Sequence, residues 1–269
     1  MTLKRTSIFV LLAAAVICMF LVLPAFGDDE AQAGRQTVSK YQDAVITVQL
    51  VISTSMSMEG AQPDKKEDKV ETTGTIVDPS GLAVVSLASI DPTEAMSRMM
   101  PEEMKDLKIT SNVTDCKIML GNGQLLPASV VLRDKDLDLA FIRPKQKPAQ
   151  PLTAVDFNTS TKPGLLDQTL ILYRYGTVGS RSLAACLDRV QSIIEKPRTF
   201  YALGLPAMGA TLGAPVFAMD TNIVGLLLLR TVPGGMTDSA SSTTGLGGEG
   251  IMYVVLPAAD VLAAAKQAP

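Results

Sequence analysis

The chain has 269 residues, 24 Lys and Arg against 27 Asp and Glu, a formal net charge of -3 and no histidine. The missing histidine excludes Ser-His-Asp and Cys-His catalytic sites and any histidine metal ligand, because imidazole is the usual base near neutral pH. The charge balance, with no basic stripe, argues against a nucleic-acid partner.

The first 27 residues have the layout of a secretory signal peptide. Lys4 and Arg5 precede an almost unbroken apolar run from Ser7 to Leu23, and small residues suited to cleavage follow. The run is slightly long for a signal peptide and slightly short for a membrane span, so an uncleaved N-terminal anchor is the alternative. In either case the rest of the chain is expected to be exported, to a periplasmic or other cell-envelope compartment, with the membrane as a partner only through residues 1–27.

Short β-branched runs and turn residues fill the first half of the chain. A polar stretch over residues 28–37 is expected to be a flexible leader, and the charged run Asp64–Lys69 is expected to be a solvated loop. The strands are expected at residues 45–53, 71–77, 82–87, 116–120, 125–133 and 137–143. The turn signals Asp78–Gly81 and Gly121–Gly123 predict hairpins between neighbouring strands.

The segment Thr93–Leu107 is rich in methionine and helix formers, with Pro101 as an interruption. It predicts a short helix, a break and a second short helix. Its methionines lie mostly on one helical face, which is expected to pack onto the neighbouring strands; the alternative is an adaptable apolar surface for a partner.

Three prolines and two lysines between Pro144 and Pro151 predict a linker between two halves. Beyond it, further strands are expected at residues 170–173, 184–194, 199–203, 215–219, 223–229 and 251–256, and a helix at 257–267. The organisation predicted is a first β-barrel over 38–143, a linker over 144–151, and a second β-barrel with a C-terminal helix over 152–269. The fold class is therefore all-β.

Four stretches, in their order and spacing, resemble the trypsin-like peptidase domain of the HtrA (high-temperature-requirement) family. The stretches are Thr73–Gly81, Gly121–Ala140, Ala210–Val216, and the pair Ile223–Leu226 and Tyr253–Pro257. The resemblance covers the chain from about Val38 to its C-terminus. It implies a trypsin-like double β-barrel of two six-stranded barrels with short helices. The family often carries a peptide-binding PDZ domain, and none is expected here.

The resemblance also places the catalytic triad position by position. Ala88 lies where the family has its histidine, Asp138 keeps the aspartate before Leu-Ala, and Leu212 lies at the nucleophile. The preceding loop residues are changed to Ala210 and Thr211, which puts the oxyanion hole of the family in doubt. Asp138 is then either a relic of the triad or, as we favour, a carboxylate that caps nearby backbone N–H groups.

The sequence offers residues for two non-standard catalytic sites. Thr211 has a nucleophilic hydroxyl but no histidine to activate it. Ser86 and Ser89 lie near the former histidine position, but no lysine has a sequence reason to meet either in a Ser-Lys dyad. A chain without hydrolytic activity is therefore expected.

The function expected is that of an exported pseudo-protease that binds a protein or peptide, with residues Thr211, Leu212 and Gly213 of the former nucleophile loop as candidate binding residues. The alternatives are an active serine-type endopeptidase with a non-standard site, and a structural subunit of an envelope complex. No cofactor or metal site is expected, because no phosphate-binding fingerprint or ligand spacing is present. Cys116 and Cys186 are expected to be two separately buried thiols rather than a disulfide.

Overall fold

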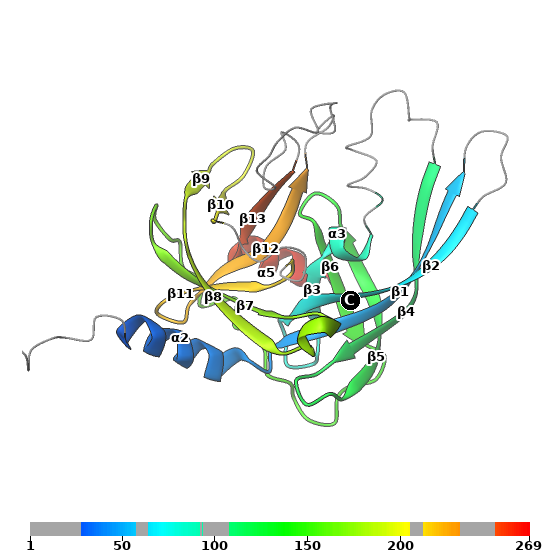
Figure 1. Ribbon diagram of the computed structural model, residues 1–269, viewed down its shortest axis with the longest axis horizontal. Helices are drawn as coiled ribbons and strands as arrows, with labels where there is room; N and C mark the ends of the chain where they lie inside the picture. Colours follow the sequence, from blue (N-terminus) through cyan, green and yellow to red (C-terminus); the bar gives the residue numbers. More distant parts are fainter. Residues whose placement is uncertain (1–27, 58–63, 92, 94–107, 205–211, 232–250) are drawn as a thin grey trace, which may run out of the picture.

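The computed structural model describes residues 28–57, 64–91, 93, 108–204, 212–231 and 251–269. Two β units lie side by side, with short helices at their margins (Figure 1). The expected signal peptide or anchor, the methionine-rich helices beyond Thr93, and Ala210 and Thr211 lie outside the described residues. Within the described residues, no helix is both long and apolar enough to cross a membrane.

The first unit is a closed six-stranded barrel with the order β1-β2-β3-β6-β5-β4. Its strands are β1 (Val45–Ser57), β2 (Asp64–Ile76), β3 (Ala83–Ser86), β4 (Lys108–Met119), β5 (Leu125–Asp134) and β6 (Leu139–Pro144). All neighbours are antiparallel. The barrel is filled by aliphatic side chains, with Ile46, Ile118 and Ile142 fully buried. The predicted hairpins over 78–81 and 121–123 join β2 to β3 and β4 to β5.

The second unit is a seven-stranded sheet rather than the predicted closed six-stranded barrel. Its order is β8-β7-β11-β12-β13-β10-β9. The strands are β7 (Gln168–Arg174), β8 (Leu183–Arg189), β9 (Ser192–Ile194), β10 (Phe200–Ala202), β11 (Pro215–Ala218), β12 (Ile223–Thr231) and β13 (Ile251–Pro257). Val190 and Gln191 divide the single strand predicted over 184–194 into β8 and β9, which end the sheet on opposite sides. The helix α5 (Ala258–Ala265) follows β13 and buries Val261 and Ala264.

The polar stretch expected to be a flexible leader is instead part of the helix α2 (Asp28–Tyr41). Gly34, Thr37 and Tyr41 are buried, and the ring of Tyr41 stacks on Phe217 of β11 with centroids 4.8 Å apart. Positions three and four apart share a helical face, so these few residues are sufficient to attach the helix. The prediction of a flexible leader was wrong because the buried face of α2 consists of small and polar residues as well as Tyr41, so the sequence there does not look like a packed helix.

The charged run Asp64–Lys69 was expected to be a solvated loop, and the structure places it in β2. It pairs with residues 51–56 of β1, and its first four side chains are exposed. Together with β4, these strands extend beyond the body of the barrel (Figure 1). The prediction was wrong because strand pairing satisfies the backbone there while the charged side chains stay in water.

The two cysteines of the described chain are free, as expected. Cys116 is buried in the barrel, whereas Cys186 of β8 is only partly buried, so the prediction of two buried thiols holds for the first alone. Burial raises the pKa of the Cys116 thiol to about 12, and it also raises the pKa of Cys186.

Candidate functional site

Asp138 occupies a turn between β5 and β6 and faces both β units. Its φ of 56° lies in the left-handed region, which short polar side chains tolerate better than most. Within the part of the chain that the structure describes, its carboxylate accepts hydrogen bonds from both β units. The donors are the Ser86 hydroxyl (2.7 Å, Oδ2), the Ala88 N–H (2.7 Å, Oδ1) and the Leu229 N–H of β12 (3.2 Å, Oδ2). The carboxylate therefore caps backbone N–H groups without any imidazole.

Ala88 lies in the short helix α3 (Leu87–Ile90), which follows β3 directly. Asp138 holds the start of this helix at two points, since its carbonyl also accepts the Leu87 N–H at 2.9 Å. The structure therefore brings together Ala88 and Asp138, two of the three positions that the sequence resemblance assigns to a triad. The methyl group of Ala88 supplies no base.

The third position, Leu212, is buried and begins the segment that leads into β11. The next residue, Gly213, has a φ of +83° and donates its N–H to the Leu227 carbonyl at 2.8 Å. Its carbonyl accepts the Thr75 hydroxyl of the first barrel at 2.9 Å. Gly213 thus ties the second sheet to the first barrel.

Glycine is required at position 213 because a Cβ there would lie 2.5 Å from the Thr73 carbonyl oxygen and 3.2 Å from the Ser86 nitrogen. The segment that begins at Leu212 consequently lies against the C-terminal end of β3, beside Ser86. Leu212 has an apolar side chain and cannot act as a nucleophile.

The hydroxyl groups near Asp138 are poorly placed for catalysis. Ser86 has no exposed surface, and its hydroxyl donates to a carboxylate rather than to a lysine amine. The base within hydrogen-bond reach of Ser86 is the Asp138 carboxylate, which is a weaker base than imidazole, and the chain has no histidine. Among the described residues, no cluster of three or more Cys, Asp or Glu side chains could hold a metal ion.

Two arginines of the second unit, neither of which stood out in the sequence, contact the first. The Arg174 guanidinium donates to the Val45 carbonyl at 2.6 Å and to the Gln42 carbonyl at 3.1 Å. Arg181 forms an ion pair with Glu71 of β2, with an N–O distance of 2.7 Å. The hydrogen bonds from the Arg181 side chain hold the pKa of Glu71 below its usual range. No local pattern marks these residues, because their partners lie more than 100 positions away.

No protein-family model matches the sequence, and no curated protein matches it. Among solved structures, the chain is similar to the serine endoprotease from Yersinia pestis, with a TM-score of 0.55 and 14% sequence identity. The similarity covers 87% of this chain and 65% of the endoprotease chain. At this identity the likeness concerns the fold.

The fold defined by the closed barrel, the second sheet and this structural neighbour is the trypsin-like serine protease fold. The fold predicted from the sequence is confirmed, with a second half that is less closed than expected.

Proposed function

We propose that this chain is an exported pseudo-protease, in which the trypsin-like fold binds a protein or peptide and cleaves nothing. The observation that carries the proposal is the bonding of Asp138. Three donors from Ser86, Ala88 and Leu229 engage a carboxylate that, in an active site of this kind, would orient an imidazole.

Binding by strand addition is supported by the part of β12 that β11 does not cover. β13 pairs with β12 from Gly225 to Thr231, whereas β11 pairs with it only from Ile223 to Leu226. Within the described residues, positions 228–231 thus have a strand neighbour on one side alone. An extended peptide laid along this edge would pass close to Asp138, because the Leu229 N–H already reaches that carboxylate.

Inactivity is tested with a probe that reacts covalently with serine nucleophiles and with a protein substrate. The purified full-length chain is treated with a fluorophosphonate probe, with and without Ser86→Ala, Ser89→Ala and Thr211→Ala, and is assayed with casein. We expect no labelling and no cleavage. Labelling that disappears with one of these substitutions would show a working hydroxyl nucleophile and overturn the proposal.

A gain-of-function variant tests whether Ala88 and Leu212 occupy the histidine and nucleophile positions of a triad. Ala88→His combined with Leu212→Ser restores the side chains that a triad needs around Asp138. We expect the double variant to react detectably with the same probe, and either single variant not to. If the double variant folds and stays as inert as the unmodified chain, Ala88 and Leu212 are not the triad positions.

The test of binding uses an immobilised library of extended peptides, followed by amide hydrogen exchange on the chain with the strongest ligand. We expect slowed exchange at residues 228–231. A chain that captures no peptide but co-purifies stably with other envelope proteins would favour a structural subunit instead.

A further inference from the structure

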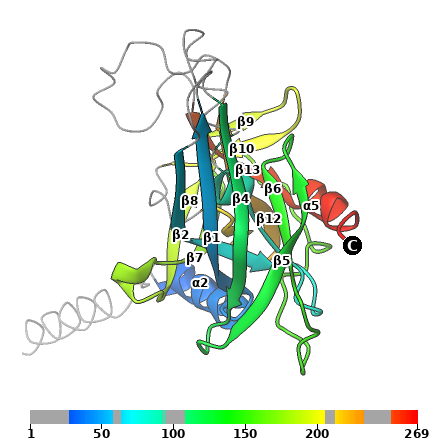
Figure 2. The same cartoon turned by 90° about the vertical axis from the view of Figure 1, so that its right-hand side faces the viewer.

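β4 and β5 are neighbours in the closed barrel, yet they pair over a very short length. Only Lys117–Met119 of β4 pair with Leu125–Pro127 of β5. Beyond that point β4 still pairs with β1, and β5 still pairs with β6, but the two strands diverge from each other (Figure 2). Among the described strands, residues 108–116 of β4 and 128–134 of β5 consequently each have one edge without a strand partner.

The divergence opens a groove in the barrel wall with a volume of about 280 Å³. This volume is near the lower end of the range of roughly 300–1,000 Å³ that is typical of ligand sites. The floor is apolar and belongs to the barrel core, where Val113, Cys116, Ala128 and Val130 pack together. The rim is polar and includes Asn112, Ser129, Arg133 and Lys145.

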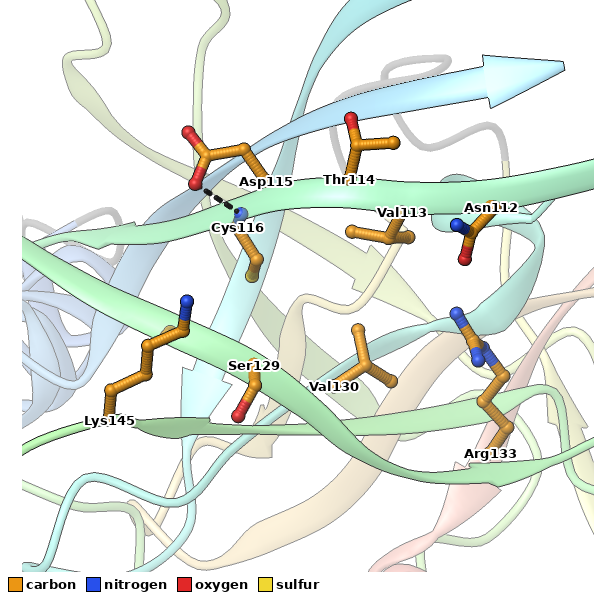
Figure 3. Close-up of a pocket in the computed structure, with 10 residues that line it drawn as sticks. Asn112, Val113, Thr114, Asp115, Cys116, Ser129, Val130, Arg133 and Lys145 are labelled. Carbon is orange, nitrogen blue, oxygen red and sulfur yellow. Dashed lines mark hydrogen bonds between the residues drawn. The ribbon is translucent and has the colours of Figure 1, made fainter.

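The two basic side chains of the rim lie at opposite ends of the groove (Figure 3). Arg133 lies near Asn112, and Lys145 lies near Cys116 and Asp115. Both are exposed, and no salt bridge involves either side chain in the part of the chain that the structure describes. Four positions separate Asn112 from Cys116, and because a register shift leaves Thr114 unpaired, they span somewhat less than the roughly 13 Å of a regular strand.

The one acidic residue of the groove is already engaged. Asp115 is paired with Lys117 at 2.8 Å, and its other oxygen accepts the Cys116 N–H at 3.0 Å. Asp115 therefore does not neutralise the far end of the groove at Arg133, and the rim keeps a net positive charge.

We propose that this groove is a second binding site, separate from the region around Asp138, and that it takes an extended acidic peptide as an added strand on β4. The backbone of the peptide pairs with the unpartnered edge of β4, and two carboxylates reach Arg133 and Lys145. Alternate residues of a strand share a face. The rim cations are exposed on the outside of the barrel wall, whereas the floor faces the core, so the matching pattern has acidic residues four positions apart and small apolar residues at the odd positions between them.

A single small anion fits this groove less well than a peptide. Arg133 and Lys145 lie at opposite ends of the groove (Figure 3), so one carboxylate or phosphate is not expected to contact both. The apolar floor between them would also stay uncovered, whereas a β-branched side chain would fill it. The strand edge supplies donors and acceptors that only a polypeptide backbone can meet in series.

The experiment measures fluorescence anisotropy of labelled Ser-Glu-Val-Thr-Val-Glu-Ser titrated with the full chain. A peptide of identical composition, Ser-Val-Glu-Thr-Glu-Val-Ser, keeps Glu and Val on opposite faces but moves the carboxylates to two positions apart. We expect the first peptide to bind and the second to bind about tenfold more weakly, because it can satisfy only one of the two cations. Failure of the first peptide to bind at millimolar concentration overturns the proposal, as does equal binding of the two.

Protein variants locate the site. Arg133→Gln combined with Lys145→Gln is expected to weaken binding at least about tenfold, while the exposed Lys147→Gln, two positions from Lys145, is the matched control and leaves it unchanged. Hydrogen exchange of the complex is expected to slow at residues 112–116. Slowing at residues 228–231 instead would overturn this proposal and support peptide binding beside Asp138, so the two proposals can fail independently.

Discussion

The region around Asp138 and the groove between β4 and β5 differ in how their polar groups are satisfied. Around Asp138, the carboxylate, two backbone N–H groups and a buried hydroxyl bond to one another across both β units. In the groove, two strand edges and two cations face an open space. The first region is thus organised for internal stability, whereas the second has bonding capacity left for a ligand.

The largest effect is expected where the two β units meet at Gly213. Gly213→Ala combines a strained φ of +83° with a Cβ 2.5 Å from a backbone oxygen. We expect the free energy of unfolding to fall by about 2–4 kcal/mol, measured by urea denaturation.

Gly123→Ala is the matched control for that substitution. Gly123 has the same φ of +83°, but nothing lies within 4 Å of a Cβ there. Its loss should be limited to about 1 kcal/mol. Equal losses for the two variants would mean that the contact of Gly213 with the first barrel contributes nothing.

The next effect concerns the Asp138 carboxylate. Asp138→Asn suits the same backbone conformation but leaves one acceptor oxygen for three donors. We expect a loss of about 1–3 kcal/mol in urea denaturation, because buried donors are left without a partner. Asp136→Asn, an exposed position in the same turn, should change stability by about 0.5 kcal/mol or less. A neutral Asp138→Asn would contradict the internal role assigned to this residue.

A smaller, pH-dependent effect is expected from the ion pair between Glu71 and Arg181. The pKa of Glu71 is lowered in the folded chain, so its contribution is fully present above the ordinary pKa of a glutamate and is lost as the pH falls through the lowered value. The unmodified chain should therefore lose more stability than Glu71→Gln between pH 6 and pH 3. Glu67→Gln, on the exposed part of the same strand, serves as the control, and parallel pH profiles for all three chains would refute the prediction.

The smallest expected effect is a difference in reactivity between two thiols, and it tests whether the groove floor at Cys116 stays closed to solvent. In a Cys18→Ser background, a disulfide reagent at about pH 8 should react with Cys186 before Cys116, since reaction needs the thiolate and burial raises the pKa of Cys116 to about 12. Cys116 should react fully only in denaturant. Similar rates for both thiols would show that the barrel wall opens between β4 and β5 in solution.

The sequence was sufficient for the fold, and two residues that the resemblance assigns to a triad, Ala88 and Asp138, lie in contact in the structure. β-branched runs and turn residues located most strands, because strand pairing and hairpin turns leave local signals. For Leu212, the contacts with the first barrel are made by the next residue, Gly213.

The attachment of α2, the ion pair of Glu71 and the groove could not be predicted, because no local sequence pattern marks them. The helical face of α2 depends on Phe217, and the partner of Glu71 is Arg181, 110 positions away. The groove begins where β4 and β5 stop pairing at Pro127, and which residues of the two strands pair is set by their register and not by either strand alone. Such features follow from long-range packing, which periodicity and turn residues do not encode.

The attachment of α2 has a consequence for the order in which this chain can fold. Tyr41 packs on β11, and the Arg174 side chain bonds to the carbonyl of Val45, 129 positions earlier. These contacts cannot form until the second sheet exists, although α2 leaves the ribosome first. Contacts between distant parts of a chain form slowly, so the N-terminal helix is expected to be among the last elements to dock, after the first barrel has closed.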